Sequence, residues 1–504
     1  MILEDWKKLQ NGSDIRGVAL DGVAGENVNL TSEVAKILGM AFATWLGRKG
    51  FEHPRAAIGM DSRITGPTLK QAFSEGLTAL GVDVKDCGMA STPAMFMACI
   101  DEKMKVDGAV MLTASHLPFN RNGMKFFTAQ GGFDKQDIND LLEIAAAGSF
   151  PGSGQPGMVE KADFVSVYAG TLVNKIREGV NDPDRYNEPL GGLKIIVDAG
   201  NGAGGFFASK VLVPLGANIE GSQFLEPNGL FPNHVPNPED AEAIQSISTA
   251  VKRTGADLGV IFDTDVDRSA VVDGSGKAIS RNELIALISA VVLEEHPGSV
   301  IVTDSITSTG LKWFIEEELR GIHLRYKRGY RNVINESKRL NEVGSASWLA
   351  IETSGHAALK ENYFLDDGAY LVAKLLIKMA RLKKENRSLA SLIEKLPAPT
   401  ESQEFRLPLT GEDFYEYGNN IISFLGELAL KKPGWTLDKP NYEGIRILCS
   451  DPKENGWFLL RLSLHDPLMP LNIESDVEGG VNVILSRLVQ LLKDFKYLDI
   501  SSLL

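Results

Sequence analysis

Three carboxylates stand at alternate positions in one short segment, at Asp263, Asp265 and Asp267. Carboxylates this close repel one another and raise one another's pKa unless a cation offsets them. An oxygen-rich group without Cys or His favours a hard divalent ion, Mg²⁺ more than Zn²⁺. Arg268 follows directly and adds the positive charge that a phosphate needs. An acidic surface turn is the alternative interpretation of this segment alone.

A hydroxyl and an imidazole are adjacent at Ser115 and His116. They follow residues 108–112, an apolar run typical of a buried strand, and the Pro, Asn and Gly residues of 117–123 predict a loop. In open α/β sheets ligands bind at this edge, where strands give way to loops. A Ser-containing turn without chemistry is the alternative for this segment alone.

A third group places an acceptor, a hydroxyl and an imidazole close together at Glu352, Ser354 and His356. Gly355 permits the tight turn that lets these side chains converge. Such a sequence also fits an ordinary helix N-cap.

Two further segments could hold a phosphate. Residues 327–332 form a compact basic loop that contains Arg331. Arg461 and Ser463 precede an Asp-Pro turn, and an Arg with a hydroxyl and turn amides can bind phosphate. A solvated arginine is the alternative interpretation of Arg461 taken singly.

Each of the first three groups follows the second of two strand-like apolar segments. The same layout occurs three times, at residues 56–63 and 108–112, at 193–202 and 256–268, and at 299–305 and 346–356. Between the strands of the first copy, residues 69–81 have apolar spacing of three and four and end at Gly, which predicts a helix. Strands alternating with helices indicate mixed, largely parallel sheets with both faces covered. Three similar α/β sandwich domains are therefore expected.

The chain of 504 residues is long enough for several domains. Residues 148–157 are rich in Gly, Pro and Ser and predict a loop or linker. The remainder after residue 396 lacks the repeat and predicts a smaller α+β domain, with a strand within 457–465 and a helix over 481–495. The predicted domains are 1–155, 156–280, 281–396 and 397–504.

Composition restricts the partners and the compartment. The net charge of -14 argues against a nucleic-acid partner held through phosphate contacts. Three cysteines without CxxC spacing favour a reduced, cytoplasmic location. The N-terminus does not have the pattern of a signal peptide, and no stretch reaches the roughly 18 apolar residues of a membrane span. We expect neither secretion nor a membrane partner.

Together these segments resemble the motifs of the α-D-phosphohexomutase family, which includes phosphoglucomutases, phosphomannomutases and phosphoglucosamine mutases. The similarity spans nearly the whole chain, and the motifs occur in the family's order. The matching segments are 13–17 (an N-terminal Arg loop), 61–63 (a strand end), 113–116 with 122–125 (the phosphoserine loop), 263–268 (the metal loop), 352–356 (the sugar-binding loop), 461–463 (the phosphate-binding loop), 198–204 and 236–238.

The resemblance implies four domains around a central cleft, each contributing one loop. It implies an isomerase, of the phosphoglucomutase/phosphomannomutase type, that interconverts hexose 1-phosphate and hexose 6-phosphate of glucose and/or mannose. Ser115 would carry a phosphoryl group, transfer it to the sugar to form a bisphosphorylated intermediate, and take back the other phosphate. Mg²⁺ is the implied metal, glucose 1,6-bisphosphate the implied activator, and a monomer or homodimer the expected assembly.

The resemblance also assigns roles residue by residue. The implied catalytic residues are Ser115, Arg16, Lys125, Arg268 and His356. The implied metal ligands are Ser115, Asp263, Asp265 and Asp267. The implied substrate-binding residues are His116, Arg331, Glu352, Ser354, Arg461 and Ser463. Among the candidates for proton transfer only the histidine has an ordinary pKa near neutrality, so Lys125 would need a depressed pKa to act as a base.

The chain departs from the family pattern in three loops, least in the phosphoserine loop, where Leu117-Pro118 replaces the usual Asn-Pro. Thr264 and Val266 stand where the metal loop usually has Gly or Ala, which predicts a stiffer loop. His465 and Asp466 replace the usual Thr and Glu of the phosphate-binding loop. The alternatives are a phosphoglucosamine mutase, a metal-dependent sugar phosphatase with Ser115 as transient acceptor, and a non-catalytic sugar-phosphate binder. The sequence does not indicate whether the substrate is a glucose, mannose or glucosamine phosphate.

Overall fold

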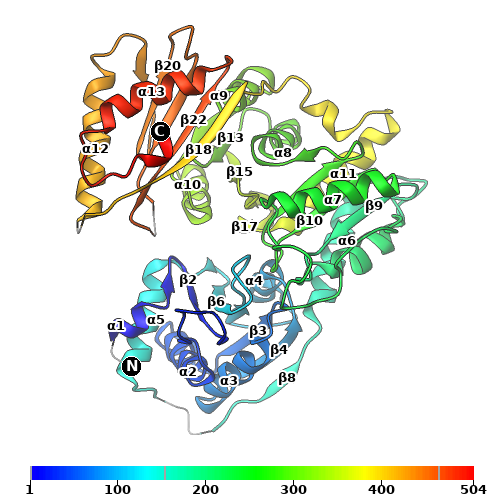
Figure 1. The fold of residues 1–504 in the computed structure, drawn as a ribbon. Helices are drawn as coiled ribbons and strands as arrows, with labels where there is room; N and C mark the ends of the chain where they lie inside the picture. The colour runs from blue at the N-terminus through cyan, green and yellow to red at the C-terminus, as the bar shows by residue number, and fades with distance from the viewer. Residues whose placement is uncertain (1–2, 152–154, 412, 464–465) are drawn as a thin grey trace. The chain divides into compact units, whose positions relative to one another are not determined.

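The computed structural model describes residues 3–151, 155–411, 413–463 and 466–504 (Figure 1). The chain forms two compact units. Unit 1 comprises Met1–Ser280 and Ser354–Ser391, and unit 2 comprises Arg281–Thr353 and Leu392–Leu504.

The first sheet of unit 1 has the strand order β1-β2-β6-β5-β3-β4-β8, and β7 pairs with β6. Its central strands β5, β3 and β4, with the edge strand β8, run parallel, and the remaining pairs are antiparallel. The strands are β1 (Gln10–Asn11), β2 (Asp14–Val18), β3 (Arg55–Met60), β4 (Asp83–Met89), β5 (Gly108–Leu112), β6 (Arg121–Thr128), β7 (Gly131–Gly132) and β8 (Val159–Lys161).

Helices α1 (Leu3–Lys7), α2 (Ser32–Arg48), α3 (Gly66–Ala79) and α5 (Lys135–Ala147) share one hydrophobic core with this sheet. Figure 1 shows α2 beside both α3 and α5, which is also where these helices contact each other. Helix α4 (Thr92–Ile100) packs on β3, β5 and β6 outside that core. The predicted helix over 69–81 is α3, which begins three residues earlier because Pro67 suits the first turn of a helix.

The second sheet of unit 1 has the order β12-β11-β10-β9, with only β9 and β10 parallel. Helix α7 packs on it with a buried apolar stripe, and α11 contacts both the sheet and α6. The remaining elements of unit 1 are α6 (Phe164–Val180), β9 (Ile195–Asp198), η1 (Phe207–Leu212), η2 (Val213–Leu215), α7 (Ala241–Thr254), β10 (Leu258–Phe262), β11 (Ser269–Asp273), β12 (Ala278–Ile279), β16 (Ala357–Leu359), η4 (Lys360–Asn362), β17 (Leu365–Asp366), α11 (Gly368–Lys384) and η5 (Leu389–Leu392). Of these, β16 and β17 pair antiparallel with each other and are not part of the second sheet.

Unit 2 begins with a parallel group in which β13 lies between β14 and β15. Its elements are α8 (Arg281–Glu295), β13 (Val300–Thr303), α9 (Thr309–Trp313), η3 (Phe314–Glu318), β14 (Ile322–Arg325), α10 (Tyr330–Glu342) and β15 (Ser347–Ile351). An antiparallel sheet of order β18-β22-β21-β20-β19 follows, and α12 and α13 share its core. Its elements are β18 (Glu401–Pro408), α12 (Phe414–Ala429), β19 (Trp435–Leu437), β20 (Ile445–Cys449), β21 (Gly456–Leu460), β22 (Leu468–Ser475), α13 (Gly480–Leu492) and η6 (Ser501–Leu503).

The predicted repeat and fold class are confirmed. The two strands of each predicted pair are parallel neighbours, namely β3 with β5, β9 with β10, and β13 with β15. The chain leaves the second strand of each pair through the loop that begins near Ser115, Asp263 or Glu352. The boundaries near residues 155, 280 and 396 stay predictions. Across the described residues no helix has the length and apolar character needed to cross a membrane.

Two glycines let α2 and α3 approach closely, since a Cβ on Gly76 would lie 2.1 Å from the Lys36 carbonyl oxygen and one on Gly39 would lie 2.2 Å from that of Phe73. We expect Gly76→Ala to lower the free energy of unfolding by about 1–3 kcal/mol, because the helices must move apart. Urea unfolding followed by circular dichroism measures this change.

Gly170 in α6 provides the matched control, because nothing lies within 4 Å of a Cβ built there. Gly170→Ala should stabilise the protein by up to about 1 kcal/mol through helix propensity alone. Equal effects of the two substitutions would contradict the close helix contact.

Candidate active site

The loop after β5 aims the hydroxyl of Ser115 at the second sheet of unit 1. Ser115 adopts a left-handed backbone with φ 50°, and its N–H donates to Oγ1 of Thr113 at 2.9 Å. Its Oγ donates to Oδ2 of Asp263 at 2.8 Å, although the two residues are 148 positions apart. The side chain is 7% exposed, so the hydroxyl is held within the protein and not free in solvent.

The three aspartates after β10 form a compact, buried group of oxygen ligands. Carboxylate atoms of Asp263, Asp265 and Asp267 all lie within 4.8 Å of one another. Burial, with the charges of Asp267 and Asp265, raises the pKa of Asp263 well above its usual range. One oxygen each of Asp265 and Asp267 is buried without a hydrogen-bond partner. Unsatisfied, mutually repelling oxygens fit a hard divalent cation such as Mg²⁺.

The loop of residues 263–268 is held by backbone hydrogen bonds from two other segments, although Thr264 and Val266 depart from the family pattern. Val266 adopts a left-handed backbone with φ 68°, which costs about 1–2 kcal/mol for a residue with a Cβ. Its carbonyl accepts a hydrogen bond from the N–H of Gly368 at 3.1 Å. The carbonyl of Thr264 accepts from Ala203 at 2.8 Å, and a Cβ on Gly202 would lie 2.7 Å from that oxygen. The segment 198–204 therefore supports the loop by close backbone contact.

Two basic side chains contact the carboxylates directly. The ammonium of Lys125, on β6, is ion-paired with Asp267 and lies 3.6 Å from Oδ2 of Asp265. The guanidinium of Arg268 lies 3.3 Å from Asp263 and donates to Oγ of Ser115 at 3.1 Å. These contacts place positive charge on both sides of the serine hydroxyl and the acids.

Arg16 lies on β2 next to the serine loop. Its guanidinium donates to the carbonyl of Thr113 at 3.1 Å and to Asp14 at 2.9 Å. Burial opposes the charge of Arg16, but the carboxylates of Asp14 and Asp265 outweigh it and raise its pKa. Arg16 is thus a fixed cation near the acids.

Two histidines of unit 1, His116 and His356, have opposite protonation preferences. Nδ1 of His116 accepts a hydrogen bond from Arg268 at 2.6 Å, and burial together with the Arg268 charge lowers the pKa of His116 to about 3. His356 donates from Nδ1 to Asp366. Burial lowers the pKa of His356, but Asp366 and Asp267 outweigh it and raise it to about 9. At neutral pH His116 is therefore an acceptor and His356 a charged donor.

Unit 2 holds the first part of the predicted sugar-binding loop. Glu352 is 4% exposed, and its Oε1 accepts from the N–H of Gly329 at 2.6 Å. Arg331 lies in the first turn of α10 with its guanidinium 5.7 Å from the ring centre of Tyr330. Ser354 follows at the start of the second part of unit 1, and its buried Oγ has no hydrogen-bond partner within the described residues.

One phosphate-binding candidate of unit 2, Arg461, lies beside a carboxylate that the sequence did not single out. Arg461 is 6% exposed, and its Nη1 lies 3.9 Å from Oε1 of Glu443. The other oxygen of Glu443 accepts from the hydroxyl of Ser305 and from the N–H of Arg328. Ser463 donates its N–H to the carbonyl of Leu468 at 2.9 Å. No pattern in the sequence distinguished Glu443, and His465 lies outside the described residues.

The structure thus brings most of the predicted residues together within unit 1. That unit contains Arg16, Ser115, His116, Lys125, Asp263, Asp265, Asp267, Arg268 and His356, while unit 2 contains Arg331, Glu352, Arg461 and Ser463. Three contributors in unit 1 were not assigned roles from the sequence: Arg63, Asn237 and Asp366. Two of them lie in segments, 61–63 and 236–238, that the family resemblance had already singled out.

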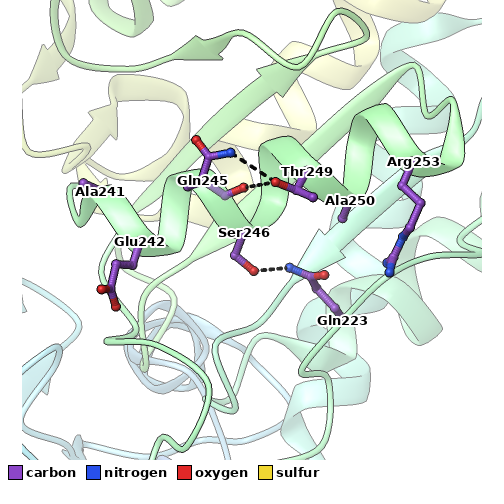
Figure 2. A pocket seen from close by; sticks show the side chains of 8 residues that line it. All are labelled: Gln223, Ala241, Glu242, Gln245, Ser246, Thr249, Ala250 and Arg253. Atoms are coloured by element: carbon purple, nitrogen blue, oxygen red, sulfur yellow. Dashed lines mark hydrogen bonds between the residues drawn. The ribbon is translucent and has the colours of Figure 1, made fainter.

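A hollow of about 530 Å³ lies elsewhere, along α7 (Figure 2). Its polar side chains bond to one another, since Gln223 donates to Ser246 at 2.7 Å and Gln245 donates to Thr249 at 3.1 Å. None of the predicted site residues lines it. The predicted site is therefore separate from this hollow.

Comparison with known proteins decides the family. Models described as phosphoglucomutase/phosphomannomutase alpha/beta/alpha domains I, II and III match residues 7–151, 173–276 and 280–399. A phosphoglucomutase of Neisseria gonorrhoeae is 30% identical over 94% of both chains. The chain belongs to the phosphoglucomutase/phosphomannomutase family. As a member it is an enzyme, an isomerase of the hexose phosphate mutase type.

Two further members are similar along nearly the whole chain. A phosphomannomutase/phosphoglucomutase of Pseudomonas syringae pv. tomato is 31% identical over 94% of this chain and 92% of its own. The crystal structure of a family protein from Burkholderia thailandensis, 29% identical, superposes with a TM-score of 0.78 and covers 98% of both chains. The family predicted from the motifs is confirmed.

His234 holds the loop that carries Asn237, whose Oδ1 accepts from Arg268 at 3.1 Å. Nδ1 of His234 donates to the carbonyl of Val235 at 2.8 Å, and Nε2 donates to Asp198 at 3.1 Å. Burial lowers the pKa of His234, but the hydrogen bond and charge of Asp198 outweigh it and raise the pKa. Because both ring nitrogens of His234 lie against hydrogen-bond acceptors, both carry a proton, and the side chain is a charged imidazolium in the folded protein.

The ion pair of His234 with Asp198 makes stability depend on pH. A raised folded-state pKa stabilises the protein fully below the unfolded pKa of about 6.5, and the stabilisation is lost as pH rises through the folded value. His234→Gln should therefore lower the free energy of unfolding more at about pH 6 than at about pH 9, as measured by urea unfolding. The exposed His53→Gln is the control. A cost of His234→Gln that is independent of pH would contradict the charged pair.

Asp263, Asp265 and Asp267 could hold a metal ion, and Mg²⁺ should then stabilise the fold. Protein treated with chelator should gain about 2.7 kcal/mol of stability from Mg²⁺ at roughly 100 times its dissociation constant. Asp265→Asn should remove most of this gain without destabilising the metal-free protein, because it removes one ligand and part of the repulsion. Thermal unfolding with and without Mg²⁺ measures both effects.

Glu178→Gln, on the exposed surface of α6, is the control and should keep the full effect of Mg²⁺. An unchanged gain in Asp265→Asn would show that Mg²⁺ binds elsewhere.

Proposed function

We propose that the enzyme interconverts hexose 1-phosphate and hexose 6-phosphate of glucose and/or mannose through a phosphoserine at Ser115. One observation carries the proposal: Oγ of Ser115 donates to Asp263 at 2.8 Å and accepts from Arg268 at 3.1 Å. A hydroxyl between metal-binding acids and a guanidinium suits a phosphoryl acceptor. Phosphoryl transfer depends mainly on positioning and on neutralising charge, and this arrangement supports both.

We propose that Ser115, Asp263, Asp265 and Asp267 hold Mg²⁺. The ion, when bound, supplies positive charge that neutralises the transferring phosphoryl group. Arg268 adds a second positive charge at the serine oxygen. Binding of glucose 1,6-bisphosphate would prime the enzyme by giving one of its phosphoryl groups to Ser115.

In the forward step, the bond between Oγ of Ser115 and phosphorus breaks as a sugar hydroxyl oxygen bonds to phosphorus. The sugar hydroxyl gives up its proton as Oγ of Ser115, released from phosphorus, takes one up. In the return step the bisphosphorylated sugar gives its other phosphoryl group to Oγ of Ser115, which gives up its proton. His356, charged at neutral pH, suits the donor that protonates the sugar oxygen released in the return step. We assign Arg16 and Lys125 to orienting the hydroxyl groups and the phosphate.

The remaining predicted residues would recognise the rest of the substrate. Glu352 and Ser354 would bind sugar hydroxyls, and the unpartnered hydroxyl of Ser354 supports this role. Arg331, Arg461 and Ser463 would bind the phosphate that is not transferred, and His116 would contact the transferred one. The names of the relatives pair glucose with mannose, which favours these sugars over glucosamine.

The location and assembly are also proposals. Burial raises the pKa of the Cys87 thiol to about 12, and Cys99 and Cys449 are likewise free and buried. Unreactive, unpaired thiols support a reduced, cytoplasmic location. A monomer or a homodimer is expected.

A coupled mutase assay tests the function. With Mg²⁺ and glucose 1,6-bisphosphate, the enzyme should turn over glucose 1-phosphate, mannose 1-phosphate or both, and Ser115→Ala should lose at least about 10³-fold of the rate, as expected for a lost nucleophile. Ser209→Ala, at an exposed serine, should keep the activity.

Other outcomes identify the alternatives. Turnover of glucosamine 1-phosphate alone would indicate a phosphoglucosamine mutase. Release of inorganic phosphate without isomerisation would indicate a phosphatase, and binding without turnover a sugar-phosphate binder.

A further inference from the structure

The side chain of Arg63 is completely enclosed in unit 1, with 0% exposure, and its guanidinium faces a single loop. Four backbone carbonyl oxygens of the loop that follows Ser115 accept its hydrogen bonds. They belong to Ser115 at 2.5 Å, Leu117 at 2.6 Å, Pro118 at 2.8 Å and Arg121 at 2.8 Å. The loop therefore folds around one buried cation.

Only a guanidinium can make this set of contacts. It has five N–H donors in a fixed planar fork, so two terminal nitrogens can each serve two carbonyls. A lysine has three donors on one nitrogen and cannot reach all four oxygens. Breaking these bonds would leave a buried charge and buried carbonyls unsatisfied, which is costly.

Arg63 is anchored independently of the loop that it holds. Asp61, at the end of β3, accepts from the N–H of Arg63 at 2.9 Å and donates its own N–H to the carbonyl of Leu112 at 3.0 Å. Gly229 and Phe231, from a loop of the second sheet, also pack against this segment. A Cβ on Gly229 would lie 2.4 Å from the Ser62 carbonyl oxygen, and the ring centre of Phe231 lies 5.3 Å from the Arg63 guanidinium. The cation is thus a fixed point against which the loop is placed.

The first of the four carbonyls belongs to the nucleophile itself. Ser115 has a left-handed backbone with φ 50°, a conformation that persists only where the surroundings enforce it. Fixing the carbonyl of Ser115 fixes the orientation of the peptide that follows it. The direction of Oγ toward Asp263 and Arg268 depends on that orientation.

We propose that Arg63 is a positioning residue for phosphoryl transfer, which holds the Ser115 loop by its backbone carbonyls so that Oγ stays between Asp263 and Arg268. It acts through the backbone of Ser115 and makes no hydrogen bond or ion pair with Asp263, Asp265 or Asp267. This inference rests on the proposed function of Ser115 as the phosphoryl carrier.

Arg63→Gln and Arg63→Lys test the proposal, with Arg55→Gln, at the exposed start of the strand β3 that precedes Arg63, as the control. Loss of alignment by about 1 Å costs about 10²-fold in rate, so kcat of Arg63→Gln on glucose 1-phosphate should fall by about that factor. KM should change less than about threefold, since Arg63 contacts no substrate. Arg63→Lys should recover part of kcat, and Arg55→Gln should match the unmodified enzyme.

Two measurements separate positioning from a general effect on folding. Intact-mass spectrometry should show slower phosphorylation of Ser115 by glucose 1,6-bisphosphate in Arg63→Gln. Hydrogen exchange in Arg63→Gln should be faster only in residues 115–121. The midpoint of thermal unfolding of the variant should equal that of the unmodified enzyme. If Arg63→Gln does not fold, Arg63→Lys provides the same comparison.

Three results would overturn the proposal. They are kcat retained in Arg63→Gln, a raised KM with unchanged kcat, or a fall in kcat that only follows the folded fraction while exchange at 115–121 is unchanged. An unmodified enzyme that neither isomerises hexose phosphates nor becomes phosphorylated would overturn the proposed function itself, and this inference with it.

Discussion

The repulsion among Asp263, Asp265 and Asp267 is the constraint on which the site depends. Three buried carboxylates cannot remain charged together unless cations balance them. Arg268 comes from their own loop, whereas Lys125 comes from β6 of the first sheet. The charge balance therefore fastens the two sheets of unit 1 to each other where Ser115 meets Asp263, and a divalent cation would complete it. The contacts that balance the charges of the aspartates also hold the two sheets of unit 1 together.

Both units use buried arginines to hold loops by their carbonyl groups. In unit 2, Arg446 stacks 3.4 Å from the ring centre of Trp457 and donates to the carbonyls of Ser305 and Thr307 at 3.0 Å. In unit 1, Arg63 does the same for the loop after Ser115. Loops that carry reactive groups must be rigid to keep their alignment, and buried networks of hydrogen bonds supply that rigidity.

Much of the fold and the identity of the acidic ligands could be predicted because they depend on local patterns. Apolar runs and helical spacing located β5, β10 and α3 to within a few residues. The order of the motifs located Ser115, Asp263 and His356 on the chain. Glu443 could not be found in this way, because its role comes only from its neighbours, Arg461 and Arg328. A carboxylate in a loop carries no pattern of its own.

The sequence by itself determined the candidate site residues and the strand ends at which they lie, because strand and loop propensities act over a few neighbouring residues. The tertiary structure decided their ion-pair partners and their protonation states. Lys125 and Asp267 are 142 positions apart, and only folding makes them an ion pair. The neutral state of His116 and the charged state of His356 are set by burial and by the charges of Arg268 and Asp366. Protonation depends on neighbours in space, which sequence distance does not reveal.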